Sequence, residues 1–244
     1  MQRYFFELSY DGSSFNGWQI QPNAPSVQEE IQNKLSRLQS NVPVKVVGCG
    51  RTDTGVHAHH YILHVDLPQI DDLDLFLMKI NRMLPDSIAI SKIYPVSDEL
   101  HARFSATERT YRYFIHTQKD PFRAQTSWYV NRELDVTKMN EAAQLLIGRK
   151  DFTSLSKLHT DVKTNICDVR HAKWIQEEDG TLYFEISADR FLRNMVRATV
   201  GTLVDVGLGK LKPEDIPTIL AAMDRQAAST SVPAHGLFLW KIEY

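Results

Sequence analysis

The sequence predicts an α+β protein of two similar lobes, each built on a mixed or mostly antiparallel sheet. Each half contains several strand patterns and about two principal helix patterns. The strands do not alternate strictly with single helices, and the turn signal EEDG joins two of them as a hairpin. These features favour α+β over a doubly wound parallel sheet. The pattern loosens around residues 100–107, so we expect one lobe over residues 1–103 and another over residues 104–244.

The first lobe opens with a strand pattern, RYFFELSY over residues 3–10, which the turn signal DGSS closes. A helix is predicted next, because Ser26 can cap it, Glu29 stands three residues on as in a capping box, and apolar residues follow at helical spacing. The remaining patterns are, in order, the strands VPVKVVG and YILHVDL, the helix LDLFLMKINRML ended by Pro85, and the strand SIAISKIYPV.

The second lobe begins with RTYRYFIH over residues 109–116, which alternates like a strand. Residues 191–207, FLRNMVRATVGTLVDVG, keep helical spacing and predict a long helix. Around them we expect the helix VTKMNEAAQLLIG stopped by Gly148, the hairpin strands VRHAKWIQ and TLYFEISA, the short helix KPEDIPTILAAMD and the final strand GLFLWKIEY.

Composition is that of an ordinary globular protein. Of 244 residues, 43% are hydrophobic and 24% charged, so disorder is not expected to dominate. The net charge of −2 does not by itself suggest a nucleic-acid partner, although charges can be clustered. Basic residues gather between Arg103 and Arg132, where Glu108 and Asp120 are the only acids. This clustering is compatible with a basic groove and equally with ordinary solvated faces.

The cysteines and the N-terminus indicate a reducing, cytoplasmic setting. Cys49 and Cys167 lack CxxC spacing, so neither a disulfide framework nor a zinc ribbon is implied. The N-terminal segment becomes polar by Glu7, too early for a signal peptide. No run approaches the roughly 18 apolar residues of a membrane helix, so we expect no membrane association.

The stretch VGCGRTDTGVHAHH, residues 47–60, concentrates chemistry-bearing side chains and admits three interpretations. His57 and His59 can share a strand face, but no cysteine or carboxylate pattern completes a metal site, so none is expected. The triplet DTG occurs in some aspartic proteases, whose two carboxylates share a proton. One DTG would require a dimer, and Arg51 two residues before Asp53 suits a buried dyad badly.

The third interpretation is a single catalytic carboxylate in a tight loop. Gly48, Gly50 and Gly55 let the backbone turn sharply and approach a ligand. Arg51 would keep Asp53 ionised and suits a substrate that carries phosphate. The structural alternative is a capping aspartate paired with a neighbouring arginine, and spacing alone leaves both open.

Five segments in order resemble one family over nearly the whole chain. GRTDTGVHA resembles the central motif of the tRNA pseudouridine synthase A (TruA) family. The other four similar segments are YDGSSFNGWQIQPNAPSVQEEI, HARFSATERTYRYFI, DRFLRNMVRATVGTLVDVGLGK and GLFLWKIEY. The match is loose before Leu237, and His59, His60 and Tyr61 stand where relatives often have small or amide residues.

The resemblance implies a tRNA-modifying isomerase. Such enzymes convert uridine to pseudouridine at positions 38, 39 and 40 of the anticodon stem-loop. The bond from N1 of uracil to ribose C1′ breaks, the base turns, and C5 bonds to C1′. Nothing is oxidised or reduced, in agreement with a sequence that carries no dinucleotide fingerprint, P-loop or metal signature, so we expect no cofactor.

Three catalytic residues follow from the resemblance. Asp53 matches the family's essential aspartate, and it can attack C1′ or C6 or take a proton from C2′. Tyr111 matches the active-site tyrosine, which can stack on uracil and take part in proton transfer; the alternative is an inward strand residue beside Tyr113. Arg197 matches a basic position expected to hold Asp53 charged, the alternative being a side chain that snorkels from an apolar helix.

The resemblance also implies RNA contacts and an assembly. Arg51 is expected to help extrude the target base, and Leu237 to form a wall of the uracil pocket. Contacts to phosphate are expected from Arg109, Arg112, Arg123 and Arg193. The family is homodimeric, with lobes like RNA-recognition motifs and an active cleft between them. A non-catalytic tRNA-binding protein of the same architecture is the alternative.

Overall fold

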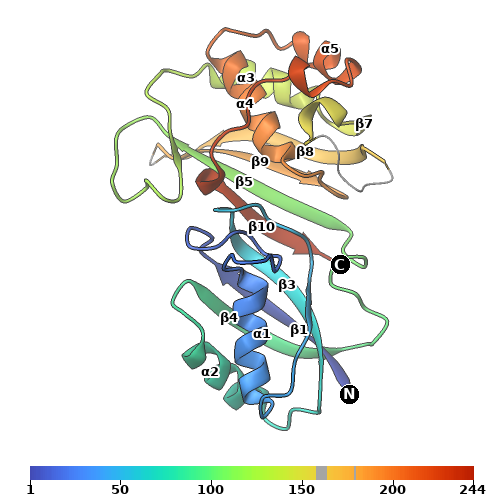
Figure 1. Ribbon diagram of the computed structural model, residues 1–244. Coiled ribbons are helices and arrows are strands. Elements are labelled where there is room, and N and C mark those ends of the chain that lie inside the picture. Colours follow the sequence, from blue (N-terminus) through green and yellow to red (C-terminus); the bar gives the residue numbers. More distant parts are fainter. Residues whose placement is uncertain (158–163, 179) are drawn as a thin grey trace. The chain divides into compact units, whose positions relative to one another are not determined.

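The computed structural model describes residues 1–157, 164–178 and 180–244 and divides into two compact units. Unit 1 comprises Met1–Thr107 and Phe238–Tyr244, and unit 2 comprises Glu108–Leu237. Helices and mostly antiparallel strands occur in both, which confirms the mixed α and β composition (Figure 1). No helix among the described residues is long and apolar enough to cross a membrane.

The sheet of unit 1 is centred on two long antiparallel strands, β1 (Gln2–Tyr10) and β3 (His57–Leu67). Strand β4 (Ile88–Val96) pairs antiparallel with the other edge of β1. Strand β2 (Val46–Gly48) pairs antiparallel with the second half of β3. The element order is thus β1-α1-β2-β3-α2-β4, and the strand order is β4-β1-β3-β2.

The last strand of the chain, β10 (Leu237–Glu243), pairs in parallel with the start of β3. Phe238 lies opposite His57, and their rings stack with centroids 4.5 Å apart. From the sequence we expected this strand within a lobe running from residue 104 to the end. Its residues from Phe238 onward cluster instead with unit 1, whose first segment ends at Thr107.

Helix α1 (Val27–Leu38) forms as its sequence predicts. The hydroxyl of Ser26 accepts a hydrogen bond from the backbone N–H of Glu29 at 3.3 Å, which caps the first turn. Val27, Ile31 and Leu35 are fully buried. Figure 1 shows α1 lying across the strands of unit 1, so the apolar stripe of the helix covers one face of that sheet.

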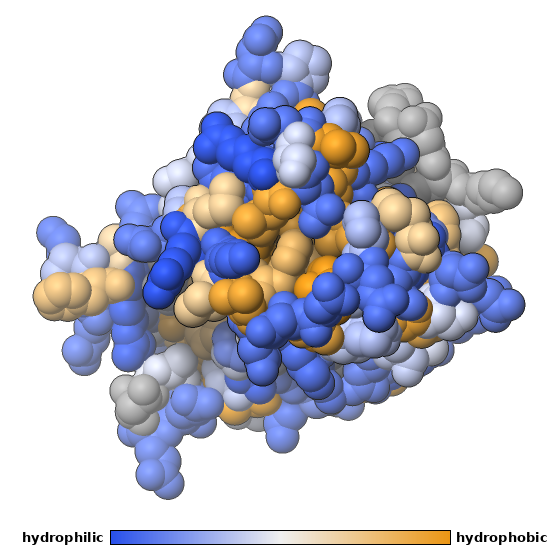
Figure 2. Space-filling model, turned by 90° about the horizontal axis from the view of Figure 1, so that it is seen from below, coloured by the Kyte–Doolittle hydropathy of each residue, from blue (hydrophilic) through white to orange (hydrophobic). Residues whose placement is uncertain are grey.

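Helix α2 (Leu73–Met83) is also confirmed, but it leaves much apolar surface uncovered. Asp72 caps it by accepting from the N–H of Leu75 at 2.8 Å, yet Ile80 is its one buried residue. Leu75 and Met78 keep 40% and 43% of their surface exposed. Figure 2 looks onto the end of unit 1 where α2 lies, and apolar surface gathers near the centre of that face.

The sheet of unit 2 has the strand order β6-β5-β9-β8-β7 and is antiparallel except for the β5–β6 pair. The strands β8 and β9 form the predicted hairpin, in which the backbone N–H of Glu177 donates to the carbonyl of Thr181 at 2.9 Å. Strand β7 was not predicted, because only its first residue, Gly148, carries a local signal. The strands are β5 (Glu108–His116), β6 (Trp128–Tyr129), β7 (Gly148–Asp151), β8 (Ile166–Gln176) and β9 (Leu182–Ala188).

The described part of unit 2 contains three α-helices: α3 (Val136–Gln144), α4 (Met195–Gly207) and α5 (Asp215–Ala221). Short 3-10 turns cover Thr153–Leu155, Arg225–Ala227 and Ala234–Gly236. The helix expected over residues 191–207 begins only at Met195, because Asn194 adopts a left-handed conformation with φ of 64°. Helix α4 packs on α3 at Gly207, where a Cβ atom would lie 2.5 Å from the sulfur of Met139.

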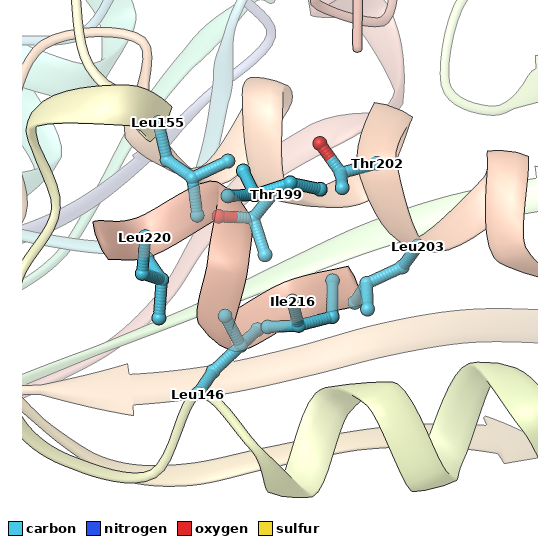
Figure 3. A pocket seen from close by; sticks show the side chains of 8 residues that line it. Leu146, Leu155, Thr199, Thr202, Leu203, Ile216 and Leu220 are labelled. Carbon is cyan, nitrogen blue, oxygen red and sulfur yellow. The ribbon is translucent and has the colours of Figure 1, made fainter. Parts of the chain in front are cut away.

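A small apolar space lies between α4, α5 and the residues after α3 (Figure 3). Thr199 reaches into it from α4, 1% exposed, with its hydroxyl among carbon side chains. Within the described parts of the chain this hydroxyl has no hydrogen-bond partner. The neighbouring hydroxyl of Thr202 donates to the carbonyl of Ala198 at 2.9 Å and accepts from the N–H of Ser229 at 3.3 Å.

Replacing Thr199 by valine is expected to stabilise the protein. The substitution removes an unsatisfied buried hydroxyl and keeps the shape of the side chain, so the free energy of unfolding should rise by about 1 kcal/mol. Urea denaturation followed by circular dichroism measures this difference. The matched control is Thr202→Val, which leaves the N–H of Ser229 without its acceptor and should lower the free energy of unfolding by about 1 kcal/mol. A loss of stability in Thr199→Val would contradict the assignment.

Candidate active site

The loop that carries Asp53 connects the end of β2 to the start of β3. It leaves the sheet at Cys49, whose N–H donates to the carbonyl of Ile62 at 2.9 Å. It then turns tightly, with the carbonyl of Asp53 accepting from the N–H of Val56 at 3.1 Å and Gly55 at a φ of 76°. Asp53 is half-buried and Arg51 is exposed. The glycine-framed turn predicted around the carboxylate is therefore present.

The segment after β1 supports this loop through direct backbone contacts. Gly17 has a φ of 85°, and a Cβ atom on it would lie 2.2 Å from the carbonyl oxygen of Thr52. A Cβ atom on Gly12 would lie 2.0 Å from the carbonyl oxygen of Val56. The N–H of Gly55 donates to the carbonyl of Phe15 at 3.3 Å. Only glycine allows two chain segments to approach so closely, so this support is specified by residue type.

Three aromatic side chains support the loop by ring stacking and hydrogen bonds. The rings of Trp18 and Tyr61 stack with centroids 4.2 Å apart, and Tyr10 lies 5.5 Å from Tyr61. The hydroxyl of Tyr61 donates to the carbonyl of Gly50 at 2.5 Å. The hydroxyl of Tyr10 is 2.9 Å from that of Thr52. We call Tyr10, Trp18 and Tyr61 the aromatic clamp; it fixes the loop on both sides of Arg51.

The histidines around the loop serve the packing of unit 1. His57 is buried, and its Nδ1 accepts from the N–H of Gly12 at 3.1 Å. His59 stacks on Trp240 with centroids 4.1 Å apart. His64 accepts from the N–H of Ala102 at 3.0 Å, and burial lowers its pKa to about 4. The described residues contain no group of three or more His, Cys, Asp or Glu side chains arranged to hold a metal ion.

In unit 2, Tyr111 lies on β5 opposite Ile186 of β9. It is half-buried, and its ring meets that of Phe191 edge to face at 5.1 Å. Tyr113, two residues along on the same face, is fully buried. The hydroxyl of Tyr113 donates to the carbonyl of Pro233 at 2.8 Å. Burial raises the pKa of Tyr113 far above its usual range, so this hydroxyl remains a donor, whereas Tyr111 keeps accessible surface for a ligand.

Arg197 lies in the first turn of α4 and is held by the segment of residues 229–233, which we call the strap. Its Nε donates to the carbonyl of Val232 at 2.7 Å, and its own carbonyl accepts from the N–H of Val232 at 3.3 Å. The strap can approach because Gly201 has no side chain; a Cβ atom there would lie 2.1 Å from the carbonyl oxygen of Thr230. The charge of Arg197 acts on Tyr113 and opposes the rise of its pKa.

The predicted RNA-contacting arginines lie in different environments. Arg112 pairs with Glu185 at 2.6 Å and lies over the ring of Tyr183. Arg109 donates to the carbonyl of Asp189 at 2.8 Å. Arg123 pairs with Asp120 at 3.4 Å, whereas Arg193 is exposed. Leu237, expected in the uracil pocket, is 6% exposed at the start of β10.

The structure thus brings the predicted residues together in two separate groups. Asp53 and Arg51 share the loop of unit 1, and Tyr111 and Arg197 belong to unit 2, where the strap links Arg197 to the environment of Tyr113. The aromatic clamp was not identified from the sequence. Two of its members, Tyr10 and Trp18, lie in the segment YDGSSFNGWQ, but Tyr61 lies far along the chain, so no local pattern joins the three.

Comparison with known proteins assigns the chain to a family. The family model for tRNA pseudouridine synthase matches residues 8–105 and 142–244. The tRNA pseudouridine synthase A of Parabacteroides distasonis is 52% identical, over 100% of this chain and 96% of that protein. The enzyme of the same name from Bacteroides fragilis is 50% identical, over 100% and 97%, and that of Bacillus subtilis is 40% identical, over 97% of each chain. This chain therefore belongs to the tRNA pseudouridine synthase A family.

Proposed function

We propose that this protein isomerises uridine to pseudouridine in tRNA, at positions 38, 39 and 40 of the anticodon stem-loop. The observation that carries the proposal is the loop of Asp53, in which glycine contacts and the aromatic clamp fix a half-buried carboxylate beside an exposed arginine. A preformed carboxylate of this kind suits a reaction on a bound nucleotide, because little reorganisation is needed when the substrate arrives.

The reaction balances without any other reactant. The bond between N1 and C1′ breaks, the freed uracil turns, and C5 forms a bond to C1′. The proton on C5 is then lost and N1 gains one, so substrate and product are isomers. Asp53 is the group that touches the nucleotide, by attack on C1′ or C6 or by removal of a proton from C2′. Each route requires an ionised carboxylate.

We assign supporting roles to the residues of unit 2. Tyr111 retains accessible ring surface on which a uracil can stack, and its hydroxyl can transfer a proton. Arg197 contributes the positive charge that favours an ionised catalytic carboxylate, and its bond to Val232 holds the guanidinium in one orientation. Leu237 is an apolar wall for the base.

We assign the phosphate contacts to arginines whose guanidinium groups are accessible to solvent. Arg193 is exposed, and Arg123 is in a solvent-exposed pair, so both can turn to a phosphate at little cost. Arg109 already donates a hydrogen bond to the carbonyl of Asp189, and Arg112 is already paired with Glu185. We therefore expect these two arginines to contribute less to phosphate binding. Arg51 is exposed at the loop and is placed to help extrude the target base, which chemistry on a stacked base requires.

We further propose a cytoplasmic homodimer with lobes like RNA-recognition motifs. The element order and strand order of unit 1 support such a lobe, since both are those of the ferredoxin-like β-α-β-β-α-β arrangement. The apolar side chains that α2 exposes offer one surface for association.

Light scattering coupled to gel filtration is expected to give a mass of about twice the 28.0 kDa of one chain. The mass should stay the same after tenfold dilution in the micromolar range, as for a stable interface. A mass of one chain at every concentration would contradict the dimer. It would not decide whether the protein forms pseudouridine, which a separate assay measures.

Asp53→Asn is expected to bind unmodified tRNA with an affinity within about threefold of the wild type and to form essentially no pseudouridine. An amide of the same shape is neither a nucleophile nor a base, so chemistry fails while binding remains. Nucleoside analysis by mass spectrometry counts the product. Asp71→Asn, an exposed carboxylate of the same unit, is the control and should behave as wild type. Product at the wild-type rate from Asp53→Asn would refute the role; a wild type that binds tRNA but forms none would favour the non-catalytic alternative.

Arg51→Ala is expected to lower turnover on folded tRNA by about 10²-fold or more, the effect of a misplaced reacting group. If Arg51 helps to extrude the base, the loss should shrink on a tRNA whose target uridine is mispaired, because a mispaired base is easier to flip. Single-turnover rates on both substrates measure this difference. Arg37→Ala removes an exposed arginine of α1 and should leave both rates unchanged. Equal losses on the two substrates would rule out base extrusion.

A further inference from the structure

A cavity of about 330 Å³ opens in unit 2 where the chain folds back after β5. Strand β6 returns parallel to the end of β5, so that Tyr129 lies opposite His116. The N–H of Val130 donates to the carbonyl of His116 at 2.9 Å, which closes the intervening loop. We call this cavity the β5–β6 pocket. The lining residues used below are His116, Lys119, Asp120, Ser127 and Tyr129.

The inner wall of the β5–β6 pocket is polar and ordered. His116 and Ser127 are 6% and 5% exposed, and the Nδ1 of His116 lies 2.9 Å from the hydroxyl of Ser127. Burial lowers the pKa of His116, and the positive charge of Arg123 lowers it further. The ring is therefore neutral near pH 7. A neutral imidazole and a hydroxyl present both donor and acceptor capacity, as the edge of a nucleobase does.

The outer wall combines exposed aromatic rings with positive charge. Tyr129 is 40% exposed and stacks on His116 with centroids 5.4 Å apart. Phe122 lies in the same loop outside the pocket lining and is 94% exposed. Lys119 is exposed, and Asp120, which also lines the pocket, is paired at 3.4 Å with Arg123 next to it. Rings on which bases stack, beside cations that meet phosphates, are what proteins use to bind unpaired RNA.

We propose that the β5–β6 pocket binds an unstacked nucleotide of the tRNA, distinct from the uridine that reacts. The base stacks on Tyr129 in the pocket that His116 and Ser127 line at its inner end, and Lys119 meets a phosphate. The volume falls in the range of about 300–1,000 Å³ typical of small-ligand sites. This inference rests on the proposed function, because it takes tRNA as the occupant.

The pocket and the tyrosine assigned to the reacting uridine are separate along β5. Tyr111 and His116 are five residues apart on one strand, which corresponds to roughly 16 Å. An odd separation also places them on opposite faces of that strand. One nucleotide therefore cannot stack on Tyr111 and enter the β5–β6 pocket at once, so the pocket adds affinity and selects among RNAs without taking part in the chemical step.

Substitution at Tyr129 tests the stacking contact. Tyr129→Ala is expected to raise the KM for tRNA about tenfold and leave kcat within twofold, since loss of one stacked base weakens binding by roughly 5- to 150-fold. Tyr129→Phe keeps the ring and should restore the wild-type KM. Tyr244→Ala removes a tyrosine of unit 1 that is 42% exposed and is the matched control. A KM for Tyr129→Ala equal to that of the control would overturn the proposal, and so would failure of phenylalanine to rescue it.

Substitution at Lys119 tests the phosphate contact. Lys119→Ala should reduce the slope of log affinity against log salt by about one, whereas Lys138→Ala, an exposed lysine of α3, should not change it. An unchanged slope in Lys119→Ala would remove the phosphate contact. Thermal melting of each variant shows that it is folded.

Equilibrium binding of unmodified tRNA separates this proposal from the proposed function. If the wild type forms no pseudouridine but Tyr129→Ala binds tRNA tenfold more weakly, the activity fails and the pocket stands. If the wild type is active and all variants bind tRNA equally, the pocket fails and the activity stands. The second outcome would also be expected if the pocket served a protein partner.

Discussion

The contact between the backbone of Gly17 and that of Thr52 is the constraint on which the candidate site depends. A Cβ atom on Gly17 would meet the carbonyl oxygen of Thr52 at 2.2 Å, so the two segments touch without any side chain between them. The carboxylate of Asp53 is consequently positioned by main chain and by the aromatic clamp. Since rigid elements hold a reacting group better than a mobile loop does, this loop behaves as an extension of the sheet.

Unit 2 contains the same kind of close backbone contact at helix α4. Gly201 admits the carbonyl of Thr230 as Gly17 admits that of Thr52, and the strap then fixes Arg197 through Val232. In both units a motif glycine lies away from the charged residue and acts by letting a second segment approach it. Such glycines shape the candidate site through backbone packing, without reaching it with a side chain.

Local features of the fold could be predicted from the sequence, and contacts between distant segments could not. The cap at Ser26 and the buried stripe of α1 follow from residues within one helix, so their spacing was sufficient. The start of α4 was predicted four residues too early, because the left-handed conformation of Asn194 leaves no periodic signal. The stacking of Trp18 on Tyr61 joins residues 43 positions apart, and no local pattern marks such a pair.

Charge patterning shows the same limit for the residues proposed to contact RNA. Basic residues between Arg103 and Arg132 looked equivalent in the sequence, yet they differ in availability. Arg112 is already matched by Glu185, so binding a phosphate there would require separating a half-buried pair. The loop after β5 instead carries Lys119 and exposed rings, and the pair that Arg123 forms there with Asp120 is solvent-exposed, so it costs little to break. We therefore expect unit 2 to hold unpaired RNA mainly at this loop, because accessible charge beside accessible rings matters more than the number of arginines along a strand.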